Sequence, residues 1–323
     1  MTKERASRPV HGSGHAGAAG RRRHEIALAG AGRWGLRILR ELVACGARVW
    51  VVDPSEEARA RARAEGASEA YPDEAGLPPF DAAVVAVPTR GHAGAVERLG
   101  ASGRPVFCEK PLTADAEEAA ALARKFSGRL FVLDKWRYHP AVEALADIAA
   151  ERSLGPVRAL RTRRVQPGIS GYDVDPVWVL APHELSIASE ILGALPPLVA
   201  ARARFAGDEV VALEAEFGAS GDFSFEAAAD CPERVREIVL ACADATVRWS
   251  MADEHAIVVE GRLAGRRTVD AEPPLAREMR ALISSLAGGK PLKTDGIQGA
   301  ASVELLERAR ALAGVTRGGR RSR

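Results

Sequence analysis

A lysine and a histidine, far apart along the chain, are the residues best suited to acid–base chemistry. Lys110 lies in the triplet Glu109-Lys110-Pro111, directly after the short apolar run 105–108. A lysine at the carboxyl end of a buried strand lies where open α/β sheets bind ligands, and loss of water there lowers its pKa toward a useful range. His183 lies near the start of a predicted helix. We expect Lys110 to be catalytic, the alternative being a surface lysine. For His183, the residues alone favour a satisfied core position.

A glycine-rich turn is the second feature with chemical meaning. Gly30 permits a tight turn, Gly32 lets a pyrophosphate approach the backbone, and Gly35 lets the following helix pack on the sheet. The free N–H groups at the start of that helix, together with its positive end, bind phosphate. The turn therefore predicts a dinucleotide site. Its expected cofactor-binding residues are Gly30, Gly32, Arg33, Trp34 and Gly35.

Asp53 ends the next apolar run and bears on the choice of dinucleotide. A carboxylate at this point accepts hydrogen bonds from the adenosine ribose and repels a 2′-phosphate. Arg33 and Ser55 are neighbours that weaken this preference. The sequence predicts NAD as the cofactor, with NADP as the alternative.

These residues need a framework, and regular alternation of strands and helices between about 25 and 133 predicts a parallel sheet covered on both faces. After residue 155 the pattern changes to one strand, a helix expected at 182–192, and a succession of strands from 197 to 260. Such a series is typical of an open antiparallel sheet. The expected fold class is α/β: an N-terminal Rossmann domain with a parallel sheet plus a C-terminal α+β domain with a mainly antiparallel open sheet.

The expected boundaries divide the 323 residues into two domains and two tails. Arginine-rich, low-complexity composition predicts that both tails are disordered. The segments are a basic tail at 1–24, the NAD(P)-binding Rossmann domain at 25–139, a substrate-binding and oligomerisation domain at 140–314, and a second basic tail at 315–323.

Composition excludes several classes of protein. The net charge of +2 is too small for a nucleic-acid binder, and no apolar run approaches the roughly 20 residues of a membrane helix. The four cysteines lack metal-ligand spacing and suggest no disulfide framework. We expect a cytoplasmic protein with no metal, no nucleic acid and no membrane partner. A nucleic-acid or membrane role for the basic tails is the alternative.

The order of these motifs resembles the glucose–fructose oxidoreductase / inositol dehydrogenase / MocA family over about residues 25–313. The triplet at Lys110 follows the fifth strand, as in that family. Residues 87–89 with His92 resemble the family's fourth-strand loop beside the nicotinamide, residues 137–140 the entry to the second domain, and 294–296 the turn before the last helix. The resemblance implies further cofactor-binding residues: Pro88, Thr89, His92, Glu109 and Lys110.

The resemblance implies hydride transfer between nicotinamide and a secondary alcohol or ketone of a sugar, cyclitol or nucleotide-sugar-like substrate. The family commonly reads D-x-G-x-H-x-x-D around the histidine that His183 matches. Val179, Ala181 and Ser186 stand at its other three positions, so an expected acid is missing. Lys110 and His183 must then act alone, or another acid such as Asp173 or Asp175 must substitute.

Two other classes of function remain open because of this departure. One is a dinucleotide-binding regulatory or non-redox protein, and the other is an NAD-assisted epimerase or lyase. Further side chains are expected to bind substrate alongside Lys110 and His183. Arg163, which shares a strand face with Arg161, would hold an anion, and the aromatic rings would stack on a sugar. These expected residues are Arg137, Tyr138, Arg163, Tyr172 and Trp178. Solvated or core positions are the simpler alternative.

The open sheet also bears on assembly. Its helices are expected to cover one face only, so the other face predicts a subunit interface. We expect a homodimer or a homotetramer.

Overall fold

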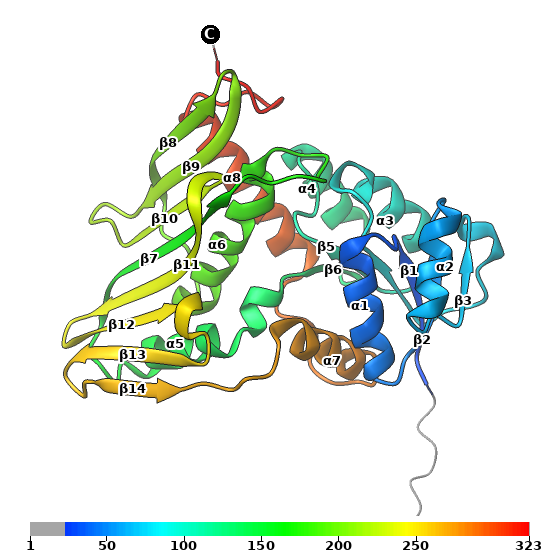
Figure 1. Ribbon diagram of the computed structural model, residues 1–323, viewed down its shortest axis with the longest axis horizontal. Helices are drawn as coiled ribbons and strands as arrows, with labels where there is room; N and C mark the ends of the chain where they lie inside the picture. Colours follow the sequence, from blue (N-terminus) through cyan, green and yellow to red (C-terminus); the bar gives the residue numbers. More distant parts are fainter. Residues whose placement is uncertain (1–22, 323) are drawn as a thin grey trace, which may run out of the picture.

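The computed structural model describes residues 23–322, which form two sheets with helices packed around and between them (Figure 1). The predicted N-terminal tail lies outside the described residues except for its last two. One apolar core runs through both halves of the molecule, from Ala27 and Val85 of the first sheet to Leu160 and Phe217 of the second. The two halves are therefore packed together rather than joined only by a linker.

The first sheet has six parallel strands, as predicted. They are β1 (Glu25–Ala29), β2 (Arg48–Val52), β3 (Glu69–Tyr71), β4 (Ala82–Val85), β5 (Val106–Glu109) and β6 (Leu130–Leu133). Their order is β3-β2-β1-β4-β5-β6. The order reverses between β1 and β4, and open parallel sheets bind ligands at such a reversal, outside the carboxyl ends of the strands.

Four helices connect these strands: α1 (Arg33–Ala44), α2 (Glu56–Ala64), α3 (His92–Gly100) and α4 (Ala116–Lys125). Helix α4 is capped by Asp115, whose carboxylate accepts the free N–H groups of Glu117 and Glu118.

The second sheet has eight strands in the order β14-β13-β12-β11-β7-β10-β9-β8. Only the β7–β10 pair is parallel, so the prediction of a mainly antiparallel sheet is confirmed. The strands are β7 (Val157–Pro167), β8 (Leu198–Ala206), β9 (Glu209–Phe217), β10 (Phe223–Ala228), β11 (Asp230–Cys242), β12 (Ala245–Ser250), β13 (Ala256–Gly261) and β14 (Gly265–Thr268). The short strand β14 was not predicted.

Three helices lie on the side of this sheet that faces the first domain: α5 (Pro140–Glu151), α6 (Pro176–Leu192) and α8 (Gly296–Leu312) (Figure 1). Helix α5 was not predicted. Helix α6 begins six residues before the expected start at Pro182, because the Asp175 carboxylate caps it and Pro176 suits the first helical position. Pro182 therefore lies inside the helix, where a proline removes one intrahelical hydrogen bond and bends the helix.

The end of the chain returns to the first domain. Helix α7 (Pro274–Leu286) packs against α1 and the short 3₁₀ turn η3 (Lys135–Tyr138), and α8 packs against α4. The predicted disordered tail at 315–323 is ordered over its described residues, which corrects that expectation. Val315 is buried, and the carbonyl of Gly319 accepts a hydrogen bond from the Val210 N–H.

Candidate active site

The glycine turn between β1 and α1 is shaped by close contacts on one side and open space on the other. Gly30 has a φ of +98°, and a Cβ there would lie 2.6 Å from the carbonyl oxygen of Ala86. A Cβ on Gly35 would lie 2.0 Å from the carbonyl oxygen of Gly30. A Cβ on Gly32 would meet no heavy atom within 4 Å. No side chain caps α1 at Gly32, so its first N–H groups face open space, which suits a diphosphate.

Asp53 closes the turn from the end of β2. One carboxylate oxygen accepts the Ala31 N–H at 2.8 Å and the other accepts the Ser55 N–H at 2.9 Å. Each oxygen keeps a second lone pair, so the carboxylate can also accept ribose hydroxyls. The residues at this turn thus fit an adenine dinucleotide.

Trp34 connects the turn to the Glu109-Lys110-Pro111 segment. Its Nε1–H donates to the Glu109 carboxylate at 2.5 Å, and the Lys135 ammonium lies 4.4 Å from its ring centroid. Glu109 is buried, and burial raises the pKa of its carboxyl group. These contacts place the segment after β5 directly beside the helix that begins the dinucleotide site.

Lys110 reaches across from β5 to helix α6. Its Nζ donates to the main-chain carbonyl of Val179 at 2.8 Å, so a neutral carbonyl is the partner where a carboxylate was expected. Loss of water around the amine lowers the pKa of Lys110 to about 8, and the neighbouring Glu109 carboxylate opposes that change. A fraction of this lysine is therefore neutral near physiological pH and can accept a proton.

His183 lies one helical turn after Val179, on the same face of α6. Its ring is tilted against Trp136, with 6.3 Å between the ring centroids, and its Nδ1 is buried without a hydrogen-bond partner among the described residues. Burial lowers the pKa of His183 well below its usual range, and the positive charges of Lys110 and Arg164 lower it further. The imidazole is therefore neutral at physiological pH and can donate or accept a hydrogen bond.

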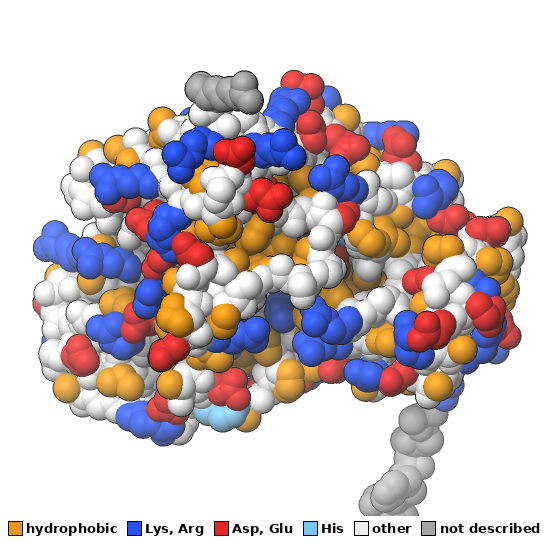
Figure 2. Space-filling model, turned by 45° about the horizontal axis from the view of Figure 1, so that its top comes forward, with side chains coloured by type: hydrophobic (Ala, Val, Ile, Leu, Met, Phe, Trp, Pro, Cys, Tyr) orange, Lys and Arg blue, Asp and Glu red, His pale blue; other side chains and the backbone are white. Residues whose placement is uncertain are grey.

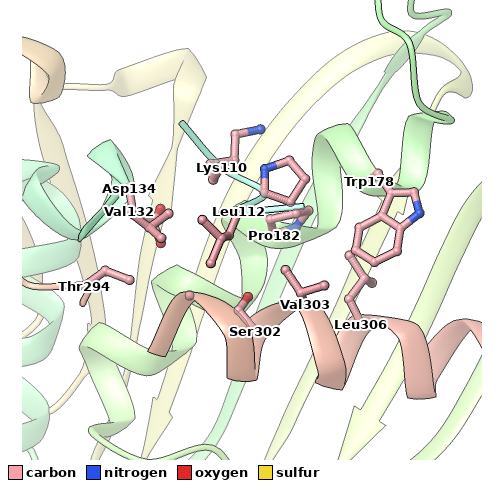
Figure 3. A pocket seen from close by; sticks show the side chains of 12 residues that line it. Lys110, Leu112, Val132, Asp134, Trp178, Pro182, Thr294, Ser302, Val303 and Leu306 are labelled. Atoms are coloured by element: carbon pink, nitrogen blue, oxygen red, sulfur yellow. The ribbon is translucent and has the colours of Figure 1, made fainter. Parts of the chain in front are cut away.

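Asp134 is a residue of this region that the sequence did not single out. It follows β6 and lines the same pocket as Lys110, opposite Ser302, Val303 and Leu306 of α8 (Figure 3). It is 8% exposed, and its Oδ1 has no hydrogen-bond partner among the described residues. Burial raises the pKa of its carboxyl group to about 6. The position of Asp134 directly after a buried strand is the feature of the sequence that could have indicated it.

The fourth-strand loop has a supporting partner from the second domain. The Asp173 carboxylate accepts the N–H groups of Thr89 and Arg90 at 3.0 and 2.7 Å, next to Pro88. His92 is 2% exposed, and its two ring nitrogens lie at hydrogen-bond distance from the carbonyls of Pro111 and Val87. His92 therefore joins two loops of the site, and its contact with the cofactor stays a prediction.

Two residues expected to bind substrate make contacts within the protein. Arg137 forms an ion pair with Glu190 at 2.8 Å and donates to the Thr294 hydroxyl at 3.0 Å. The Tyr138 hydroxyl accepts the Lys293 N–H at 2.9 Å. Both side chains therefore join η3 to the segment before α8, and their contact with substrate stays a prediction.

Arg163, which was expected to bind substrate, and its neighbour Arg164 lie on opposite faces of the sheet, because alternate residues of β7 point to opposite faces. Arg163 lies on the outer face of the sheet, where it pairs with Glu226 at 2.7 Å, while the next residue, Arg164, points inward. Arg164 is buried, pairs with Glu184 of α6 and lies over the ring of Trp136 at 4.3 Å. Of the two arginines, Arg164 is therefore the one on the sheet face that packs against α6.

The aromatic residues of the loop before α6 differ from each other. Tyr172 is 52% exposed, whereas Trp178 is 3% exposed, lines the pocket below Lys110 and lies under Arg310. The Asp175 carboxylate forms an ion pair with Arg310, so neither it nor Asp173 is a free substitute for the missing acid.

Among residues 23–322 there is no group of three or more metal-ligating side chains and no helix long and apolar enough to cross a membrane. The four cysteines are free thiols.

Residues 24–132 match the model of an oxidoreductase family with an NAD-binding Rossmann fold. The inositol 2-dehydrogenase of Rhizobium meliloti is 28% identical over 154 residues, which are 45% of this chain and 44% of that protein. The UDP-N-acetylglucosamine 3-dehydrogenase of Acidithiobacillus ferrooxidans is 32% identical over 151 residues, or 45% of this chain and 47% of that protein. The matches thus span about half the length of these curated relatives.

Similarity in fold extends over nearly the whole chain. The solved structure of the Acidithiobacillus ferrooxidans enzyme superposes with a TM-score of 0.79 at 22% identity, covering 90% of this chain and 98% of that one. A levoglucosan dehydrogenase in complex with NADH and levoglucosan superposes with a TM-score of 0.77 at 17% identity, covering 90% and 98%. At this identity the likeness shows the two-domain fold.

Proposed function

We propose that this chain is an oxidoreductase of the Gfo/Idh/MocA family, which the match of residues 24–132 supports, and that it transfers a hydride between a nicotinamide dinucleotide and a secondary alcohol or ketone of a sugar-like substrate. Sugars, cyclitols and nucleotide sugars are the substrate classes that the named relatives suggest. NAD is the proposed cofactor, with NADP as the alternative, since the Asp53 carboxylate faces the expected position of the adenosine ribose.

The observation that carries the proposal is the position and state of Lys110. It lies at the carboxyl end of β5, is joined through Glu109 to Trp34 of the dinucleotide turn, and has a pKa of about 8. The bound cofactor would supply the hydride acceptor. Lys110, when neutral, takes the proton of the substrate hydroxyl as the hydride leaves the same carbon, and it returns that proton in the reverse direction. The Val179 carbonyl holds the amine in place.

We propose that His183 orients the reacting hydroxyl. Its neutral ring lies one helical turn after Val179, whose carbonyl accepts the Lys110 amine, and it offers either a donor or an acceptor. Fixing the hydroxyl at two points aligns its carbon with the nicotinamide, which is a positioning contribution to the rate. The valine at position 179 cannot carry a proton, so Lys110 and His183 are the two proposed groups.

The missing carboxylate at Val179 also supports a second candidate, a dinucleotide-binding protein without turnover, and the epimerase or lyase alternative stays open as well. The test has two stages. Titration of NADH fluorescence measures binding of the reduced cofactor. Absorbance of NADH then follows turnover with NAD and myo-inositol, xylose, levoglucosan or UDP-N-acetylglucosamine.

Growth of NADH absorbance that Lys110→Met abolishes is the expected result. Substrate conversion without net NADH supports the epimerase or lyase instead. Binding of NADH without conversion of any compound supports the regulatory protein, and failure to bind either dinucleotide contradicts all three.

We also propose a cytoplasmic homodimer or homotetramer. Among residues 23–322, no helix covers the outer face of the second sheet. This face presents ion pairs such as Arg163–Glu226 and Arg204–Glu214 beside the buried cluster Val165, Ala212 and Ala228. Static light scattering measures the mass, and a monomer at micromolar concentration would contradict the proposal.

A further inference from the structure

Four cations gather on the substrate side of the cleft: Lys110, Lys135, Arg164 and Arg236. We call them the cation cluster. Arg164 lies 4.3 Å from the centroid of the Trp136 ring, against which the His183 ring is tilted, and Arg236 is the strand partner of Arg164. All four positive charges lower the pKa of His183. They come from four separate elements or turns of both domains, so the tertiary fold brings them together. Figure 2 shows Lys and Arg side chains gathered in the hollow between the two domains.

The two arginines face each other across neighbouring strands. Arg236 of β11 is the direct register partner of Arg164 of β7 in the antiparallel ladder. Partners in such a ladder project from the same face, and like charges in that position are destabilising. Both point inward toward α6, since Arg164 binds Glu184 there. The fold keeps a repulsive pair at this point.

Little negative charge balances the cluster. Glu184 pairs with Arg164, but no ion pair to Lys110, Lys135 or Arg236 exists within residues 23–322. Arg236 donates to the main-chain carbonyls of Val165 and Val235, both at 2.9 Å, and to the Gln166 side chain. These neutral acceptors hold its guanidinium without cancelling its charge.

Three other acids lie in this region: Glu109, Asp134 and Glu278. Burial raises the pKa of each, and none of them forms an ion pair with a member of the cluster among residues 23–322. Val179 adds no charge, because valine stands where an acid was expected. Within the described residues, three of the four cations therefore have no carboxylate partner.

We propose that the substrate is an anion, a sugar-like alcohol that carries a carboxylate or phosphate close to the reacting carbon, and that Arg236 contributes to binding it. This deepens the proposed function and rests on it. The anion replaces the missing protein carboxylate as the counter-charge of the cluster. An arginine already held by neutral carbonyls is well placed for this, because guanidinium groups bind carboxylate and phosphate through paired hydrogen bonds.

The test measures binding to the NADH-loaded protein, in which an alcohol cannot be oxidised. Isothermal titration calorimetry compares the methyl glycosides of glucuronate, glucose 6-phosphate and glucose. At least one anionic glycoside should bind about tenfold more tightly than the neutral one, a difference of about 1.4 kcal/mol, and more weakly at high salt. The two anionic arms distinguish a carboxylate from a phosphate.

Matched variants assign the preference to the cluster. Arg236→Gln should reduce the preference to about threefold or less, and Arg236→Lys should retain most of it. Arg163→Gln, on the outer face of the same sheet, should change nothing. Equal binding of the three glycosides, no measurable binding of either anion, or an unchanged preference in Arg236→Gln would overturn the proposal. NADH binding is measured first, so a failure of the proposed function appears separately as loss of cofactor binding.

Discussion

At the scale of single residues, the chemistry of the site depends on groups whose pKa is changed by loss of water. Lys110 and Asp134 line one pocket, and burial acts on them in opposite directions, since it disfavours the ammonium of one and the carboxylate of the other. Both changes bring the pKa toward neutrality. Small changes of pH should therefore change the charge of this pocket.

Lys110 makes a prediction about activity. Because the neutral amine is the base and its pKa is about 8, kcat/KM for alcohol oxidation should rise with pH and level off above that value. Lys110→Met should lower turnover by roughly 10² to 10⁴ and remove this inflection. Initial rates across pH 6 to about 10 measure both. A profile that stays the same in Lys110→Met would assign the inflection to another group.

Asp134 makes a prediction about stability. Its folded-state pKa of about 6 lies above the ordinary 3.8, so the fold disfavours the ionised form and stability falls as pH rises between those values. Asp134→Asn removes this penalty. Its free energy of unfolding should exceed that of the natural chain by up to about 3 kcal/mol above pH 6, with the difference vanishing near pH 4.

Urea unfolding at several pH values measures this difference. Asp208→Asn is the control, since Asp208 is exposed and the same change there should have no effect. A gain for Asp134→Asn that is independent of pH would contradict the assigned cause.

At the scale of elements, the glycines of the turn between β1 and α1 have different tasks. Gly30 lets the turn lie against the backbone just after β4, and Gly35 lets helix α1 lie against Gly30. Gly32 instead leaves open space beside the turn. The first two therefore serve the fold and the third serves the ligand. The sequence motif alone does not separate these tasks, but the contacts that a Cβ would make at each position do.

Two alanine substitutions test this separation. Gly35→Ala should lower the free energy of unfolding by about 3 kcal/mol, because its Cβ would overlap the carbonyl of Gly30. Gly32→Ala should leave stability within about 0.5 kcal/mol, since Gly32 has an ordinary φ of −67° and open space. The same Gly32 methyl group should weaken NADH binding by about tenfold or more, since it occupies the approach of the pyrophosphate. Normal NADH affinity in Gly32→Ala would place the pyrophosphate elsewhere.

At the scale of the whole molecule, segments near the end of the chain complete structure begun much earlier. Helix α7 packs against α1, and the carboxylate of its buried Glu278 accepts the Asp134 N–H at 2.5 Å. The last described residues pair with the start of β9, since the carbonyl of Asp208 accepts the Arg321 N–H at 2.9 Å. The two domains are therefore expected to unfold as one cooperative unit.

Removal of residues 315–323 tests the contribution of this last segment. Val315 is 5% exposed and belongs to the core that spans both sheets, so truncation should cost at least about 1.5 kcal/mol. Val315→Ala alone should cost about 1 kcal/mol. Thermal unfolding measures both, and an unchanged melting temperature after truncation would show that the segment adds nothing to stability.

The sequence by itself determined the features that depend on local pattern. Apolar runs and turn residues located the strands of both sheets except β14, and the glycine turn and the triplet at Lys110 follow from the strands that precede them. Only the tertiary structure decided which side chains meet. Arg164 rather than Arg163 faces the site, and Arg236 lies opposite it, because pairing between strands distant in sequence sets those positions. Asp134 and the ordered tail depend likewise on α7, α8 and β9, whose approach no local pattern encodes.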